Sequence, residues 1–244
     1  MKEKNNNSYL VIDERMRKIE KEKLKELGFY LIEINSTNNV YEEISSHVDI
    51  FACQIGNKLI VEPSVYKLIK EKLLDNYNIE QGKEKVKDKY PADIKYNVCI
   101  IGNKALHNFD YTDTKVKEEL ISQGYELINT SQGYTNCSIA VIDNNSAIVI
   151  DKGLYKILQK HNVDVLYLEY EPNIKLLANN GYSSKNGFIG GAISRIENNV
   201  IIFGDLNKID KDNIIRKFIL KRDLNIIEFE ELDVIDYGGI ICIK

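Results

Sequence analysis

Four short polar turns recur along the sequence, and each of them lies between two apolar segments. The turns are Gly56-Asn57-Lys58, Gly102-Asn103-Lys104, Asp143-Asn144-Asn145 and Glu197-Asn198-Asn199. Gly, Asn and Asp accept the positive φ angles that close tight hairpins. The pattern therefore predicts four β-hairpins, of which residues 138–142 paired with residues 147–150 form the clearest.

Each predicted hairpin is followed by the start of a helix, by apolar residues at three-to-four spacing, and by another short apolar strand. The helix starts are Glu62-Pro63-Ser64, Asp110-Tyr111-Thr112, Asp151-Lys152-Gly153 and Asp205-Leu206-Asn207. The predicted repeat is thus β-β-α-β. We expect the recurring acids to be helix N-caps rather than catalytic groups.

The two ends of the chain complete a further unit. Residues 9–13 predict a strand, a helix follows to about Leu27, and residues 29–34 predict another strand, so only the first hairpin strand is missing. Residues 238–243 can supply it. Pairing of the terminal segments would close five units into one α/β domain spanning residues 1–244 and would leave no exposed sheet edge.

Composition narrows the classes of partner. With 33 Lys and Arg against 37 Asp and Glu, the net charge is −4, which lacks the basic footprint of a nucleic-acid-binding protein. The apolar run at residues 9–12 is too short for a signal peptide or a membrane span, so we expect a cytoplasmic protein without a membrane partner. The four cysteines lie far apart, which predicts thiols rather than disulfides and no metal site. No glycine-rich phosphate loop is present, so no cofactor is expected.

The repeat resembles a known fold. Five β-β-α-β units closed by the chain ends are similar to the pentein fold, a five-bladed α/β propeller of the guanidine-modifying enzyme superfamily. Its members include arginine and agmatine deiminases, dimethylarginine hydrolases, amidinotransferases and a ribosome anti-association factor. His47-Val48-Asp49 resembles the His-x-Asp motif that opens a strand in deiminases and amidinotransferases. On an extended segment both side chains would share one face, where His47 could shuttle protons beside Asp49.

The resemblance also implies a cysteine nucleophile in a turn that leads into a strand. Cys137 follows Gly133 and precedes the strand predicted at residues 138–142. Cys242 has the C-terminal location typical of the family, but only two residues follow it. Alignment of the hairpin turns places Cys137 near the start of its strand and Cys242 in mid-strand, where packing is expected. We therefore expect Cys137 to be the nucleophile, with Cys242 as the alternative.

Two departures from the family pattern concern the order of the units and the acidic groups. The His-x-Asp motif lies in the first complete unit, whereas the families have it in a late one. The closest match to their acidic Gly-Gly-Asp-type segment is Gly190-Gly191-Ala192, which has alanine in place of the carboxylate. Asp93 and Asp236, at other strand starts, could bind the substrate instead, although a loop or capping role is the simpler expectation for each. All strand starts are expected to converge on one end of a central channel.

The resemblance implies a cofactor-free, deiminase-like hydrolase or an amidinotransferase-like enzyme. Its substrate would be a small cationic guanidino or amidine compound, attacked through a covalent cysteine intermediate. Two alternatives remain open at this stage. One is a non-catalytic pentein that binds a macromolecular partner, and the other is a former enzyme that senses a small cationic ligand. The sequence also leaves open hydrolysis against transfer and the oligomeric state.

Overall fold

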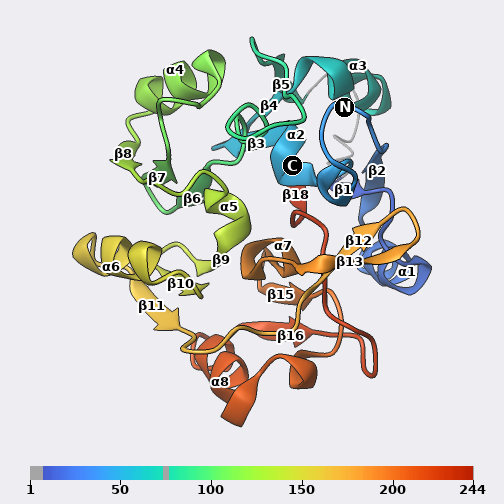
Figure 1. Cartoon of the computed structure of the whole chain (residues 1–244), viewed down its shortest axis with the longest axis vertical. Helices are drawn as coiled ribbons and strands as arrows, with labels where there is room; N and C mark the ends of the chain where they lie inside the picture. The colour runs from blue at the N-terminus through green and yellow to red at the C-terminus, as the bar shows by residue number, and fades with distance from the viewer. Residues whose placement is uncertain (1–7, 74–76, 244) are drawn as a thin grey trace, which may run out of the picture.

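The computed structural model describes residues 8–73 and 77–243 and has a mixed α/β fold of small three-stranded sheets. Within the described residues, five sheets share one connectivity, in which an antiparallel pair is followed by a helix and a strand parallel to the middle strand. Figure 1 shows them around the middle of the molecule, with their long helices on the outside.

The five units have the following bounds. The first comprises β18 (Ile241–Ile243), β1 (Tyr9–Asp13), α1 (Lys18–Glu26) and β2 (Tyr30–Ile34). The second comprises β3 (Ala52–Ile55), β4 (Lys58–Val61), α3 (Pro63–Lys72) and β5 (Asn78–Gln81). The third comprises β6 (Cys99–Ile101), β7 (Lys104–His107), α4 (Thr114–Ser122) and β8 (Glu126–Asn129). The fourth comprises β9 (Ile139–Asp143), β10 (Ser146–Val149), α6 (Lys152–Lys160) and β11 (Asp164–Tyr167). The fifth comprises β14 (Ile193–Ile196), β15 (Asn199–Ile202), α8 (Ile214–Leu220) and β16 (Asn225–Ile227), with the 3₁₀ turns η2 (Leu206–Lys208) and η3 (Lys211–Asn213) before α8.

A further sheet was not predicted. It consists of β12 (Lys175–Ala178), β13 (Gly181–Asn186) and β17 (Ile235–Asp236), and β17 is parallel to β12. Its sequence carries no clear apolar alternation, and β13 is mostly exposed. This sheet is important for the site because β17 ends at Asp236.

The predicted hairpins are confirmed, and so is the pairing of the chain ends. In the clearest hairpin, Ile139 pairs with Val149, and in the terminal unit Leu10 pairs with Cys242. Positive φ angles occur at Gly56, Gly102 and Glu197. The third turn is closed differently, because the Asn145 N–H donates to the Asp143 carboxylate at 2.7 Å.

The capping prediction holds with one correction. Glu62, Asp151 and Asp205 each accept a backbone N–H at the start of a helix or 3₁₀ turn. In the third unit the cap is Asp113, which accepts from two N–H groups of the first turn of α4. Asp110, the predicted cap, lies in the preceding turn, because the helix begins three residues later than its sequence suggested.

Three single-turn helices precede the first strands of their units, where continuous strands were predicted. They are α2 (Val48–Phe51), α5 (Thr135–Ser138) and α7 (Ile189–Ala192), and Figure 1 shows them near the middle of the molecule. The strand predicted at residues 138–142 therefore begins at Ile139, and the strand that follows His47-Val48-Asp49 begins only at Ala52. The apolar runs are too short for their periodicity to separate one helical turn from a strand.

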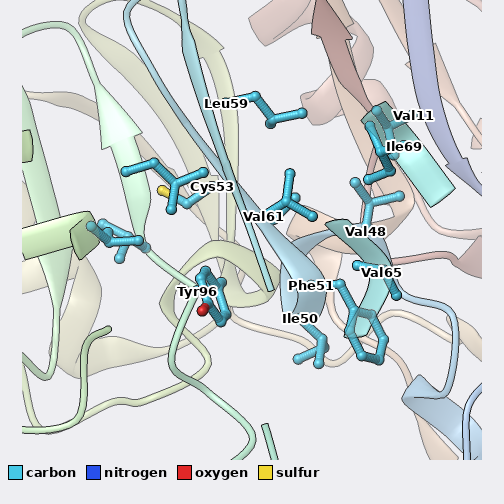
Figure 2. Close-up of a cluster of buried hydrophobic side chains, with 14 of the residues drawn as sticks. Val11, Val48, Ile50, Phe51, Cys53, Leu59, Val61, Val65, Ile69 and Tyr96 are labelled. Carbon is cyan, nitrogen blue, oxygen red and sulfur yellow. The ribbon is translucent and has the colours of Figure 1, made fainter. Parts of the chain in front are cut away.

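Buried side chains hold α2 in place (Figure 2). Val48, Ile50 and Phe51 are fully buried in a cluster that includes Val61 of β4 and Val65 of α3. Burial of each such side chain contributes about 1.5–3 kcal/mol. Because three of its four side chains are anchored in this way, α2 has little freedom to move, and its remaining side chain, that of Asp49, is fixed in direction.

A buried polar network attaches α1 to the C-terminal segment. Glu20 accepts from the Arg17 guanidinium at 2.5 Å and from the Tyr237 hydroxyl at 2.9 Å. The Arg17 guanidinium also donates to the carbonyl oxygens of Phe203 and Asp233, both at 2.9 Å. Glu20 is fully buried, so these donors supply the hydrogen bonds that water would otherwise make.

We predict that Glu20→Ala lowers the free energy of unfolding by about 3 kcal/mol, because it leaves the Arg17 charge without its carboxylate in a largely buried position. Chemical denaturation measures the change. Glu22→Ala is the matched control on the same helix, because Glu22 is paired with Lys18 at an exposed position. The loss in this variant should stay below about 0.5 kcal/mol. Equal losses in the two variants would contradict a stabilising role for the network.

Candidate functional site

Four of the candidate residues meet near the middle of the molecule. His47 is the N-cap of α2, Asp49 lies in α2, Cys137 lies in α5, and Asp236 ends β17. The expectation that His47 and Asp49 share an extended segment is wrong, because the chain enters a helical turn directly after His47. All four residues are nevertheless buried, with at most 3% of their surface exposed.

The Cys137 thiol points at a carboxylate. Its S–H group donates to Asp49 Oδ2 at 2.8 Å, and the Asn136 side-chain amide donates to the same oxygen at 3.2 Å. The sulfur itself accepts from Asn97 Nδ2 at 3.1 Å. This arrangement gives the thiol proton an acceptor and gives the sulfur a donor.

Asp236 and His47 form a second buried pair. Asp236 accepts from the N–H groups of Gly238 and Phe188, both at 2.8 Å, and its Oδ1 lies 3.8 Å from His47 Nδ1. Among the described residues, neither ring nitrogen of His47 nor Oδ1 of Asp49 has a hydrogen-bond partner. Buried polar atoms are rarely left unpaired, so these atoms are available to a ligand.

Burial shifts every titratable group of the site toward its neutral form. Desolvation, followed by the charges of Asp49 and Asp236, raises the pKa of the Cys137 thiol well above its usual value. Desolvation raises the pKa of Asp49 to about 6, against the opposing effect of its hydrogen bonds. It also raises the pKa of Asp236 and lowers the pKa of His47, although each of these two groups partly counteracts the shift of the other. The Cys137 thiol is therefore protonated at neutral pH.

A cavity of about 310 Å³ opens onto three of these four residues, namely His47, Cys137 and Asp236. Asp49 lines a different cavity. The walls are largely apolar and comprise Tyr41, Ile44, Tyr134, Leu176 and Phe188. Glu43, Asn186 and Lys185 complete the lining, and Lys185 lies 2.8 Å from the Glu43 carboxylate. Among the described residues of the lining, Lys185 is the one Lys or Arg side chain, and its charge is already paired.

Asp93 lies behind the cavity wall rather than in the lining. It is fully buried, and its Oδ2 accepts from the hydroxyls of Tyr41 at 2.7 Å and Tyr134 at 2.5 Å. The two hydroxyls are 2.6 Å apart. Asp93 thus orients two walls of the cavity through their hydroxyl groups.

Gly190 and Gly191 lie in α7, where they permit close packing. A Cβ atom on Gly191 would lie 1.7 Å from Asp236 Oδ1, and one on Gly190 would lie 2.2 Å from the Asn136 carbonyl oxygen. Neither glycine lines the cavity that contains Cys137. Gly191 thus permits the approach of Asp236, and Gly190 permits the approach of α5 and lines a separate cavity with Asp49.

Cys242, the alternative nucleophile, lies in β18 opposite Leu10 and packs against the cluster that contains Leu10 and Tyr237. It does not line the cavity of Cys137. Disulfides are absent among the four cysteines. Within the described part of the chain, no group of three or more His, Cys, Asp or Glu side chains is arranged to hold a metal ion.

Sequence reasoning missed Asn97, Asn136 and the aromatic walls of the cavity. A signal for Asn97 was available, because Asn97, Cys137 and Gly191 each stand two residues before the first strand of their unit. The alignment of hairpins that selected Cys137 therefore points to Asn97 as well. No comparable signal existed for Tyr41, which lies in a connecting segment just before η1 (Glu42–Ile44).

Comparisons with known proteins agree with this architecture. A dimethylarginine dimethylaminohydrolase from Pseudomonas aeruginosa, solved in complex with citrulline, superposes with a TM-score of 0.57 at 10% identity, covering 92% of this chain and 91% of that one. An agmatine deiminase from C. jejuni gives a TM-score of 0.51 at 17% identity, covering 92% and 75% of the two chains. At these identities the likeness establishes the fold alone.

Sequence comparison identifies the family. No curated protein sequence matches the chain. In the part of the chain that the structure describes, no helix has both the length and the apolar composition needed to cross a bilayer. The model of the DUF6873 family, a family of unknown function, matches residues 11–241. The chain therefore belongs to the DUF6873 family and is a divergent protein of the pentein fold.

Proposed function

We propose that this protein is a cysteine-dependent enzyme that acts on a small guanidino or amidine compound, with Cys137 as nucleophile. The observation that carries the proposal is the buried contact between the Cys137 thiol and Asp49, next to Asp236 and His47 at the end of one cavity. A thiol, two carboxylates and an imidazole supply the nucleophile, the cation-binding groups and the proton carrier that attack on an amidine carbon requires.

The charge of the site selects the substrate. Asp236 lines the cavity and Asp49 contacts the Cys137 thiol, whereas the Lys185 charge in the lining is paired with Glu43. A guanidinium or amidinium ion would compensate the carboxylates and could bind them through paired N–H groups. The same cation would lower the pKa of the Cys137 thiol, so the nucleophile is formed only when the substrate is present.

The first half of the reaction begins with loss of the thiol proton to Asp49, its hydrogen-bond acceptor. The thiolate forms a bond to the central amidine carbon, and the C=N electron pair moves onto nitrogen. The C–N bond to the leaving amine then breaks, as the proton that the thiol gave up passes from Asp49 to His47 and from His47 to the amine. The products are a free amine and a thiouronium adduct on Cys137.

In the second half, water attacks the adduct carbon after His47 takes up one of its protons. The C–S bond breaks, His47 returns its proton to the sulfur to restore the thiol, and the remaining hydroxyl proton is released to solvent. The substrate carbon leaves with a new C=O bond in a urea-type product. An amine that replaces water in this step would make the reaction an amidine transfer, and both outcomes use the same residues.

The proposal extends to the architecture. We infer that the five units are blades of one closed α/β propeller and that the chain is one domain. The shared connectivity of the five sheets and the antiparallel pairing of β1 with β18 support this inference. Residues 1–7, 74–76 and 244, which the predicted domain also included, lie outside the described residues.

The charge preference of Cys137 can be tested with two alkylating agents of nearly equal size. Chloroacetamidine is a cation and chloroacetamide is neutral. We predict that the cation labels Cys137 at least about tenfold faster, because an ion pair near buried carboxylates is worth several kcal/mol. Mass spectrometry of the native protein identifies the labelled cysteine.

Cys242 is the internal control for this experiment, because it lies outside the cavity and should show no comparable preference. Turnover is then measured as release of amine and ureido product from a panel of guanidino compounds, and Cys137→Ser should abolish it. Equal labelling of Cys137 by both reagents would refute the cation site. Cation preference without turnover of any compound would instead favour the sensing of a cationic ligand.

The charge preference should also depend on pH. Asp49 has a pKa of about 6, so it is ionised above that pH and neutral below it. We predict that the ratio of the two labelling rates falls below about pH 6, approaching tenfold per pH unit if Asp49 dominates. Both labelling rates are proportional to the fraction of Cys137 that is ionised, so this fraction does not affect their ratio. In Asp49→Asn the ratio should be low and nearly independent of pH, and an unchanged profile would remove Asp49 from the cation site.

A further inference from the structure

Asn97 is a fully buried residue that connects three units of the fold at the site. It lies in the segment before β6, and its side chain reaches both α2 and α5. Its backbone N–H donates to the Ile94 carbonyl oxygen at 2.9 Å, which fixes the main chain. A side chain in this position is tightly restrained.

The hydrogen bonds of Asn97 also fix which way its amide faces. Oδ1 accepts from the backbone N–H groups of Asn136 at 2.9 Å and Cys137 at 3.3 Å. The opposite end must therefore be the NH₂ group, which donates to the Asp49 carbonyl oxygen at 3.4 Å and to Cys137 Sγ at 3.1 Å. A flipped amide would direct its NH₂ group at two backbone donors.

We propose that Asn97 is a positioning residue that holds Cys137 for attack and stabilises the sulfur as a thiolate. Among the described residues, Asn97 supplies the one hydrogen bond donated to this sulfur. The hydrogen bonds from the backbone N–H groups of Asn136 and Cys137 to Oδ1 set the position of Cys137. The side-chain N–H donated to the sulfur favours its negatively charged form. This inference rests on the proposed function only in giving the thiolate a reaction to perform.

The electrostatic reason is the imbalance around the sulfur. Asp49 accepts the thiol proton at 2.8 Å, and its negative charge opposes ionisation of the thiol. A donor aimed at the sulfur favours the charged form, and the effect is enlarged where water is excluded. Asn97 is thus the group of this chain that works against Asp49 at the sulfur.

The experiment compares Asn97→Ala with Asn136→Ala in the full-length protein. The rate of Cys137 alkylation by iodoacetamide is measured from about pH 6 to 10, a range that includes the usual thiol pKa, with thermal melting to confirm that both variants are folded. Asn97→Ala should slow the reaction about tenfold or more at each pH below the plateau and move the profile to higher pH. Asn136→Ala removes a donor to Asp49 instead, makes that carboxylate easier to protonate, and should not move the profile upward.

A nearly isosteric variant covers the case in which Asn97→Ala does not fold. Asn97→Asp keeps the oxygen that accepts from Asn136 and Cys137 but replaces the donor with a carboxylate oxygen, so it should slow alkylation by more than about tenfold. The inference is overturned if alkylation in the folded Asn97 variants follows the wild-type profile, or if the Asn136 variant shifts upward equally. Because alkylation requires no turnover, this result is separate from the failure of any guanidino compound to react.

Discussion

The burial of two carboxylates and an imidazole, with no Lys or Arg paired to either carboxylate among the described residues, is the constraint on which the rest of the site depends. Removing such groups from water is costly, and the cost is offset only by well-placed donors. Here the donors are a thiol, the Asn136 amide and the backbone N–H groups of Gly238 and Phe188. None of these donors carries a charge, so both carboxylates keep a raised pKa. A cationic ligand would add the attraction between opposite charges that neutral donors cannot supply.

Holding these donors in place requires backbones that approach one another closely. Gly238 has a φ of +68°, and a Cβ atom there would lie 2.6 Å from both Asp49 Oδ1 and His47 Cβ. Gly191 is equally restricted, because a Cβ atom would lie 1.7 Å from Asp236 Oδ1. Glycine at these positions is a condition for bringing α2, α7 and the C-terminal segment to one point. Val48, Ile50 and Phe51 are packed in a buried cluster, and this packing prevents α2 from moving away from the other two segments.

The sequence was informative about the repeat and less informative about the centre. Hairpins could be predicted because turn chemistry and alternating apolar strands are local signals, and the closure of the chain ends followed from counting what each end lacked. The single-turn helices could not be predicted, because four residues such as Val48–Phe51 carry no periodicity that separates a helical turn from a strand. For the same reason Asp49 was assigned to an extended segment.

Alignment of the units identified part of the site. It selected Cys137, which the structure places against Asp49. The same alignment places Asn97 at the equivalent position of another unit, but this residue was not recognised as part of the site. No local sequence pattern indicated that Asp93 lies behind Tyr41 and Tyr134. This placement depends on contacts between segments far apart in the chain. The sheet that ends at Asp236 was missed because β12 and β13 lack a buried face with regular alternation.

The departures from the family pattern have a common geometric explanation. Asn97, Cys137 and Gly191 occupy equivalent positions in three successive units, and α2 brings Asp49 to the same region from a fourth. When equivalent positions of several units converge, the order of the units along the chain does not determine which side chains meet. A His-x-Asp motif in an early unit can therefore face a cysteine in a later one. The Gly190-Gly191-Ala192 segment itself lacks a carboxylate, but Asp236 approaches Gly191 from another sheet. Equivalent position, rather than order in the sequence, is thus the basis on which site residues can be compared across this fold.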